Sequence, residues 1–262
     1  MQLTVNGFSM AYSDAGQGTP LLLVHGFPLN GRLWHPQLDG LSDVARVIAP
    51  DLRGHGDSQA VPGPYSMDLF ADDLNVLLDA LGIQEKIILC GLSMGGYVVF
   101  AFYRKYAHRL HGLILTATRA GADTSAGKAG RDKMMVLARE KGVAAISESM
   151  LPKLLAPQTY PARPDLVEQV RAITLGVSLE GVLGDLAALK ERPDSTSTLA
   201  QIDVPTLILH GADDQIIPLS EAEAMRAGIH GSKLVVVPQA GHLLGLENAN
   251  LFNQAVRHSL KE

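Results

Sequence analysis

Cysteine is almost absent from this sequence, because Cys90 is the single one among 262 residues. One cysteine cannot form an intrachain disulfide, which suits a reducing compartment. Basic charge is not in excess either: 22 lysines and arginines stand against 27 acidic residues, and no basic run stands out. We therefore expect neither nucleic acid nor an anionic membrane as a partner.

Long hydrophobic segments of two kinds are also missing. Residues 1–6 lack the basic segment and the apolar segment that a signal peptide needs. No apolar run is long enough to span a bilayer. These features predict a cytoplasmic protein with no membrane contact. The hydrophobic fraction of 47% is nevertheless sufficient for one sizeable core, as in a single α/β domain.

One stretch carries a specific chemical signal. Residues 86–99 read KIILCGLSMGGYVV, so an apolar strand enters a glycine-rich turn around Ser93 and a helical run follows at once. This strand–turn–helix context is the one that a G-x-S-x-G nucleophile elbow requires. Glycines on both sides leave room where a Cβ would clash. The Ser93 hydroxyl is therefore expected to stand free at the top of a sheet, beside the N-terminus of the new helix.

Strand and helix patterns alternate along most of the chain, which predicts an α/β fold with a mostly parallel sheet flanked by helices. An Asn6-Gly7 turn between two short strands is a strong hairpin signal. Eight strands are expected in all, at residues 2–6, 8–13, 21–24, 44–49, 87–90, 113–115, 204–209 and 233–237. Helices are expected at residues 33–38, 66–81, 97–106, 219–227 and 247–260.

The pattern changes between Arg119 and about Thr198, where buried strand runs stop and helical patterns take over. Prolines at positions 152, 157, 161 and 164 punctuate this region. We interpret residues 119–198 as a helical cap inserted over the sheet, and residues 1–118 and 199–262 as the core. The helices expected in the cap cover residues 128–141, 143–151, 165–174 and 179–190.

With the elbow and the insertion in place, the chain resembles the α/β-hydrolase superfamily over nearly its whole length. The segments GLSMGG at 91–96 and PTL at 205–207 look like those of bacterial family V esterases. The segment HGFPL at 25–29 also looks like that of cofactor-free haloperoxidases or perhydrolases. The spacing and the cap resemble 3-oxoadipate enol-lactone hydrolases and acyl-homoserine lactone hydrolases. These relatives share a catalytic triad, so the resemblance implies the chemistry better than the substrate.

A serine hydroxyl is a poor nucleophile until a base takes its proton. That base should be a histidine late in the chain, and His242 follows directly after the last expected strand. The catalytic histidine of the family occupies this place, so the resemblance implies His242 as the base. The chain order of serine, acid and histidine is then the one that this fold uses.

The base needs a carboxylate to hold its tautomer. Residues 211–218, GADDQIIP, match the Gly-x-x-Asp-x-x-x-Pro pattern of the family, which places the acid at Asp214. Its neighbour Asp213 would then be an exposed loop residue. The rival acid is Asp123, because some relatives carry their acid after the strand that follows the elbow. Thr118 and Arg119 occupy the place directly after that strand here, which weakens this rival.

A tetrahedral intermediate needs two donors for its oxyanion. The backbone N–H groups of Met94, directly after the nucleophile, and of Phe27, in the loop after the third strand, are expected to supply them. Bulky apolar residues near the site are the candidates for the wall of the substrate pocket. They are Phe27, Trp34 and Met94 in the core, and Met134, Met135, Leu137 and Met150 in the cap.

Other polar residues are expected to be structural. The loop at residues 51–58 includes Asp51 and His55, and the resemblance implies that it serves as scaffolding through hydrogen bonds to its own backbone. Cys90 is expected to be a small core residue. No histidine, cysteine and aspartate cluster has zinc spacing, and no G-x-G-x-x-G fingerprint follows a strand. We therefore predict neither a metal nor a cofactor.

The sequence thus predicts a serine hydrolase of small carboxylic esters, a carboxylesterase, that works through an acyl-enzyme. Three alternatives remain open: a lactonase of the acyl-homoserine lactone or 3-oxoadipate enol-lactone type, a cofactor-free perhydrolase, and a hydrolase-fold signalling module. The expected partner is a small ester or lactone, and the expected assembly is a monomer or a homodimer. The bulky wall and the short cap predict a closed pocket for short acyl chains.

Overall fold

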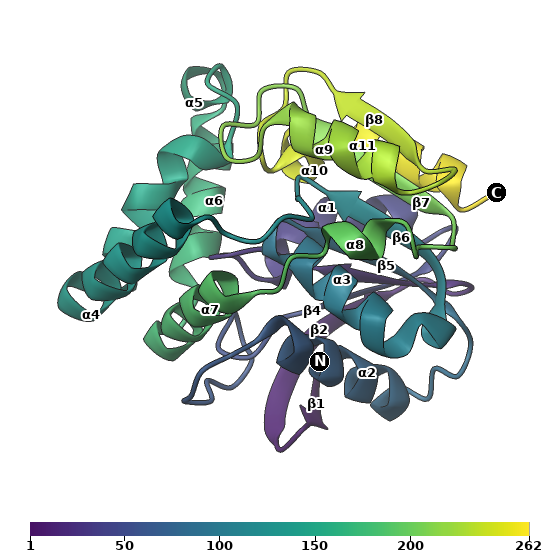
Figure 1. The fold of residues 1–262 in the computed structure, drawn as a ribbon, viewed down its shortest axis with the longest axis horizontal. Helices are drawn as coiled ribbons and strands as arrows, with labels where there is room; N and C mark the ends of the chain where they lie inside the picture. The colour runs from purple at the N-terminus through teal and green to yellow at the C-terminus, as the bar shows by residue number, and fades with distance from the viewer. Residues whose placement is uncertain (262) are drawn as a thin grey trace.

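The computed structural model describes residues 1–261, which form an eight-stranded sheet (Figure 1). The strand order is β1-β2-β4-β3-β5-β6-β7-β8. β1 and β2 pair antiparallel, β2 pairs antiparallel with β4, and the other neighbours are parallel. The predicted α/β fold with a mostly parallel sheet is therefore confirmed. The strands are β1 (Gln2–Val5), β2 (Phe8–Ala15), β3 (Pro20–Val24), β4 (Arg46–Pro50), β5 (Ile87–Leu92), β6 (Leu110–Thr116), β7 (Thr206–Gly211) and β8 (Lys233–Val237).

Helices cover both faces of the sheet, so the central strands are buried on both sides. All residues of β3 and β5 are buried, which explains why these strands read as continuous apolar runs. Two hydrophobic clusters result, one on each face. One face carries α2 (Met67–Ala80), α3 (Met94–Tyr106) and α9 (Leu219–Gly228), and the other carries α1 (His35–Leu41) and α11 (Ala249–Ser259).

Local sequence signals explain where several elements begin. Ser66 precedes α2, and its side chain accepts a hydrogen bond from the Leu69 N–H at 3.0 Å, as an N-cap residue does. Five short helical turns carry little periodicity, and the sequence predicted none of them as a separate element, although the helices predicted at 33–38 and 247–260 overlap the first and the last. The five turns are η1 (Gly31–Trp34), η2 (Ala107–Arg109), α5 (Thr159–Ala162), α8 (Thr196–Leu199) and α10 (Leu244–Glu247).

The segment between β6 and β7, residues 119–198, holds helices and is called the cap below. Its long helices are α4 (Ser125–Leu154), α6 (Pro164–Leu175) and α7 (Leu179–Glu191). In Figure 1 they lie together with α5 at one side of the sheet. The two helices predicted at 128–141 and 143–151 correspond to the two helical segments of α4, which meet at a kink at the non-helical Gly142, where φ is 75° and ψ is −177°. This backbone conformation favours glycine.

Several polar contacts join the cap to the core, among them the hydrogen bonds from Asn30 Nδ2 to the Ile173 carbonyl (3.1 Å) and from Gln215 Nε2 to the Leu155 carbonyl (3.0 Å). Two further contacts centre on the carboxylates of Asp185 and Glu247. The His55 Nε2 atom lies 2.8 Å from Asp185 Oδ2 on α7, and both side chains are fully buried. Glu247 forms the second contact. Its Oε1 atom accepts hydrogen bonds from the cap groups Ala156 N–H (2.8 Å) and Thr159 Oγ1–H (2.6 Å), while Oε2 accepts one from the Gly241 N–H (2.7 Å). These two contacts tie the cap to two separate parts of the core.

Within residues 1–261, no helix combines the length and the apolar character that crossing a membrane requires.

Candidate active site

Ser93 lies at the sharp turn between β5 and α3. Its backbone has φ 54° and ψ −113°, a left-handed conformation that is costly for a residue with a side chain. The turn is held by the Ser93 N–H, which donates to the Thr116 carbonyl (2.9 Å), and by Thr118 Oγ1, which donates to the Ser93 carbonyl (2.8 Å). A Cβ at Gly91 would clash with the Gly95 carbonyl oxygen, so the glycine-rich pattern is a steric requirement.

His242 and Asp214 are brought together by the loops after β8 and β7. The His242 Nδ1 atom lies 2.8 Å from Asp214 Oδ2, and both side chains are buried. Asp214 Oδ1 accepts hydrogen bonds from the backbone N–H groups of Ile216 (2.8 Å) and Ile217 (3.1 Å). Burial raises the pKa of Asp214, but His242 and these N–H groups outweigh it and hold the pKa below its usual value. The carboxylate is therefore ionised at neutral pH and fixes the orientation of the imidazole.

Neither alternative acid contacts His242. Asp213 Oδ2 accepts a hydrogen bond from Gln158 Nε2 of the cap at 2.7 Å, and the residue is partly exposed. Asp123 is bound instead by arginines. A second buried histidine, His210, has its Nε2 atom 3.0 Å from the Ile217 carbonyl and 4.0 Å from Asp214 Oδ2. Burial lowers the pKa of His210, so this side chain is neutral beside the Asp214 loop.

Ser93 and His242 line one cavity of about 100 Å³. A larger surface hollow of about 660 Å³ lies elsewhere, beside Met1, Arg32 and Asp57. We take the smaller cavity as the candidate active site because it holds the strained serine and the histidine. Its walls are formed by Phe27, Ser93, Met94, Tyr97, Arg119, Arg131, Met150, Leu189, Ile216, Ile217 and His242.

Three of the residues predicted as pocket walls, Phe27, Met94 and Met150, line this cavity. The others lie elsewhere in the described chain. Trp34 is 1% exposed and packs against Phe252, with a ring-centroid distance of 5.9 Å. Met135 lines a separate surface hollow between the cap and the loop at residues 62–64. Met134 and Leu137 pack, half-buried, against the hydrophobic core. Apolar spacing on α4 could not reveal which face of the helix covers the cavity.

The two amides expected to bind the oxyanion are both available. Met94 is the first residue of α3, so its N–H has no partner within the helix. Within residues 1–261, neither this N–H nor that of Phe27 donates a hydrogen bond to another protein group. Both residues line the cavity that contains Ser93.

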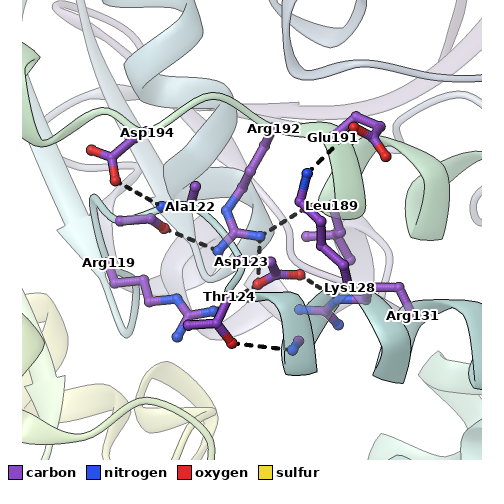
Figure 2. A network of polar contacts seen from close by, with 12 residues as sticks. Arg119, Ala122, Asp123, Thr124, Lys128, Arg131, Leu189, Glu191, Arg192 and Asp194 are labelled. Carbon is purple, nitrogen blue, oxygen red and sulfur yellow. Dashed lines mark hydrogen bonds and ion pairs between the residues drawn. The ribbon is translucent and has the colours of Figure 1, made fainter.

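Two arginines of the cavity wall were not singled out as site residues by the sequence. Arg119 follows β6 and Arg131 lies on the first half of α4, and both contact Asp123 (Figure 2). Charged residues on an amphipathic helix look like a solvated face, so the sequence gives little reason to place Arg131 inside. The position of Arg119, directly after a buried strand, was the available signal, since such positions meet at the carboxyl edge of a parallel sheet.

Cys90 lies fully buried in β5, and burial raises the pKa of its thiol to about 12. The thiol is therefore protonated at neutral pH and is a poor nucleophile. Among residues 1–261, no group of three or more histidine, cysteine, aspartate or glutamate side chains is placed to hold a metal ion.

An eight-stranded, mostly parallel sheet with a serine at a strained turn after a central strand is typical of α/β hydrolases, and the comparisons with known proteins agree with this class. Residues 19–147 and 161–249 match the model of the alpha/beta hydrolase fold family, so the chain belongs to that family. The predicted superfamily is therefore confirmed.

Three relatives illustrate the range of the family. A thermophilic esterase from Thermogutta terrifontis, solved with malate bound, is 44% identical, with a TM-score of 0.96 over 100% of this chain and 97% of that one. The enol-lactonase from Burkholderia xenovorans LB400 is 27% identical, with a TM-score of 0.93 and complete coverage of both chains. The non-heme chloroperoxidase CPO-A1 of Kitasatospora aureofaciens is 34% identical over 82% of each chain.

Proposed function

We propose that this protein is a carboxylic ester hydrolase for small substrates, with Ser93, His242 and Asp214 as its catalytic triad. One observation carries the proposal. The buried His242–Asp214 contact of 2.8 Å and the strained Ser93 turn share one small cavity. The Nε2 atom of His242 makes no hydrogen bond to another group of the described chain, so it is available for the Ser93 proton. The esterase from Thermogutta terrifontis adds support from similarity.

The proposed reaction has two halves. Ser93 Oγ attacks the ester carbonyl carbon while His242 accepts the hydroxyl proton, and the Phe27 and Met94 N–H groups stabilise the oxyanion. The carbon–oxygen bond to the leaving alcohol then breaks, and His242 returns its proton to that alcohol. In the second half, His242 takes a proton from water as the water oxygen attacks the carbonyl carbon of the acyl-enzyme. His242 then returns this proton to Ser93 Oγ as the bond between Oγ and the acyl carbon breaks, which releases the carboxylic acid and free Ser93.

The nucleophile is tested by Ser93→Ala. This variant should fold normally and lower kcat for p-nitrophenyl acetate by about 10⁶, as for a triad serine. A fluorophosphonate probe should label the wild type but not Ser93→Ala. The control is Ser149→Ala, which should still be labelled; in the wild type the Ser149 hydroxyl donates to the Ile146 carbonyl on α4. Unchanged activity or labelling of Ser93→Ala would contradict the proposal. A single slow burst of wild-type product without steady turnover would favour the signalling module.

The acyl group is proposed to be short. The cavity of about 100 Å³ is smaller than the roughly 150 Å³ that hold a benzene molecule in an engineered apolar site. We expect kcat/KM in a p-nitrophenyl ester series to be highest at roughly two to six carbons. Each methylene that fits should contribute about 0.8 kcal/mol until the wall is reached. A maximum at dodecanoyl would refute a closed pocket.

A lactone is the second candidate substrate, because the enol-lactonase from Burkholderia xenovorans matches the whole chain. Opening a lactone uses the same steps, except that the leaving alcohol stays attached to the acyl group. A lactone preferred more than tenfold over every ester would assign the protein to the lactonases. The chloroperoxidase relative supports perhydrolysis as a side reaction, with hydrogen peroxide in place of water, and peracid formation from acetate would detect it.

A further inference from the structure

One buried carboxylate in the cap is surrounded by guanidinium groups (Figure 2). The Asp123 side chain is 1% exposed, and Oδ1 lies 2.8 Å from both Arg119 Nη2 and Arg192 Nη1. Its Oδ2 atom accepts a hydrogen bond from Arg131 Nε at 2.9 Å. Burial raises the pKa of Asp123, but the arginines outweigh it and keep this carboxyl ionised. One negative charge therefore faces three positive ones.

The three arginines are not equivalent. Arg192 is used internally: its side chain is 2% exposed, it donates to the Leu189 (2.8 Å) and Gly121 (3.0 Å) carbonyls, and it lies 4.2 Å above the Tyr97 ring. Arg119 and Arg131 are 26% and 22% exposed, and both reach the wall of the cavity that contains Ser93. The excess positive charge is thus presented to the substrate.

The described protein groups balance this charge only in part. Asp194 attracts Arg192, but its carboxylate is engaged by the backbone N–H groups of Ala122 and Thr196. Glu221 attracts Arg119 without a direct contact. The described wall of the cavity contains two arginines and no carboxylate.

Arg131 also has donors to spare. It uses Nε for Asp123, and its two terminal nitrogens make no hydrogen bond within the described chain. Partly buried positive charge in excess of its counter-ions is costly, and a pocket for purely apolar acyl groups would gain nothing from it. The cavity is therefore complementary to an anion.

We propose that Arg119 and Arg131 bind a carboxylate of the substrate, so that the preferred substrates are esters or lactones that carry a second, free carboxylate. This inference rests on the ester hydrolase function proposed above and names its substrate class. A guanidinium can bind a carboxylate through two parallel hydrogen bonds, which fixes orientation as well as position. The anchored carboxylate would hold the scissile carbonyl beside Ser93 and thereby raise kcat/KM.

The experiment compares each anionic substrate with a neutral partner of nearly the same shape. Monomethyl succinate against methyl succinamate places the charge on the acyl side. Acetoxyacetate against acetoxyacetamide places it on the alcohol side. A hydrogen bond to a charged group contributes about 1.5–3 kcal/mol, so kcat/KM should favour the anion by roughly 10–150-fold in one of the two pairs. That pair locates the carboxylate, and the preference should shrink as ionic strength rises.

Two variants assign the preference to the arginines. In Arg131→Gln the ratio of kcat/KM between anion and neutral partner should fall at least tenfold, whereas Arg131→Lys should keep part of it. The ratio is taken within each variant, so a general loss of activity cancels. Asp123 keeps Arg119 and Arg192 in this variant, so folding should persist. The control is Lys128→Gln, which removes an exposed cation of α4 that pairs with Glu191 at 3.5 Å outside the cavity wall. Its ratio should stay within about twofold of wild type.

The outcomes are distinguishable from failure of the enzymatic proposal. If p-nitrophenyl acetate is turned over but neither anion is preferred, the carboxylate subsite is refuted while the esterase stands. A preference that survives in both Arg131→Gln and Arg119→Gln would also refute it. If no ester or lactone is turned over, the proposed function itself fails. Should the arginine variants not fold, the proposal is still tested by the wild-type ratio of kcat/KM between anion and neutral partner and by the decrease of this ratio with ionic strength.

Discussion

Two buried histidine–aspartate pairs occur in this molecule, and they are alike at first sight. His242 and Asp214 are 2.8 Å apart at the candidate active site, and His55 and Asp185 are 2.8 Å apart between the core and the cap. All four side chains are at most 1% exposed. A distance and a burial value alone would not tell which pair is catalytic.

The second ring nitrogen separates the two pairs. His55 Nδ1 contacts the Arg53 carbonyl at 2.9 Å, so both nitrogens of His55 are used by the protein. A carbonyl oxygen and a carboxylate both need a donor, so His55 is held as an imidazolium. Burial lowers the pKa of His55, but Asp185 and the Arg53 carbonyl raise it more, and the net pKa is above 6.5. In the other pair, His242 lines the Ser93 cavity with Nε2 uncommitted, as a general base requires.

The largest expected effect is on catalysis, and it distinguishes the proposed catalytic Asp214 from the structural Asp185. Asp214→Asn should lower kcat by about 10³–10⁴, because the imidazole is then held in the wrong tautomer. Asp185→Asn, the matched change in the other pair, should alter kcat by less than about fivefold when both proteins are fully folded. Steady-state kinetics with p-nitrophenyl acetate measure both. A large loss in Asp185→Asn or in Asp123→Asn would reverse the assignment of the acid.

The next effect is on stability. Asp185→Ala should lower the free energy of unfolding by about 3–5 kcal/mol, because it leaves the His55 imidazolium buried without its partner. Urea denaturation should show this as a lower midpoint with an unchanged slope. Asp213→Ala is the control, since a partly exposed loop residue should cost within about 0.5 kcal/mol. A loss below about 1 kcal/mol in Asp185→Ala would mean that the pair contributes little to holding the cap.

A smaller effect concerns pH. Because folding raises the pKa of His55, the stabilisation is fully present below about pH 6.5 and is lost as the pH rises through the raised value. Burial raises the pKa of Asp185, which acts in the same direction at lower pH. The melting temperature of wild type should therefore fall, relative to Asp185→Asn, by about 2–5 °C between pH 6.5 and pH 9. Parallel melting curves for the two proteins would contradict an ionised pair.

The smallest effect distinguishes the adjacent acids. Asp213→Asn should change kcat by less than about twofold, because Asp213 contacts the cap residue Gln158 and leaves the partners of Asp214 untouched. The same kinetic assay decides. If Asp213→Asn had the effect expected of Asp214→Asn, the alignment of residues 211–218 with the family pattern would be wrong by one position.

Local signals in the sequence were sufficient for most of the fold. Continuous apolar runs predicted β3 and β5, because strands buried on both faces leave no alternation. The run at residues 233–237 predicted the observed bounds of β8, although this edge strand is mostly exposed or half-buried. The break between the two expected cap helices falls at Gly142, where the kink in α4 lies. The short turns α5 and α8 were missed because four residues carry no helical period.

The candidate site likewise has a part that the sequence predicted and a part that it did not. Ser93, Asp214 and His242 are tied to motifs at strand ends, and the structure brings them to one place. The cavity wall is not a local property, because it depends on which face of α4 lies over the sheet. Methionines at positions 134 and 135 were therefore expected in the wall, whereas Arg131, on the same helix, lies there. The ion pairs of Asp123 join residues that are separated in the sequence, and no periodic pattern predicts them.

The contacts that the cap makes with His55 and Glu247 also bear on how this enzyme can be rebuilt. Glu247 receives backbone and side-chain donors from cap residues 156 and 159, and His55 receives a carboxylate from position 185. A chimera that takes its cap from a relative must therefore keep an acid at position 185 and a free amide at position 156. Because Glu247 also holds the N–H of Gly241, next to His242, a graft that fits poorly would disturb the base directly. Exchange of cap helices for new specificity is thus best confined to α4 and its Arg131 face, because α4 precedes positions 156, 159 and 185 in the chain and leaves these contacts in place.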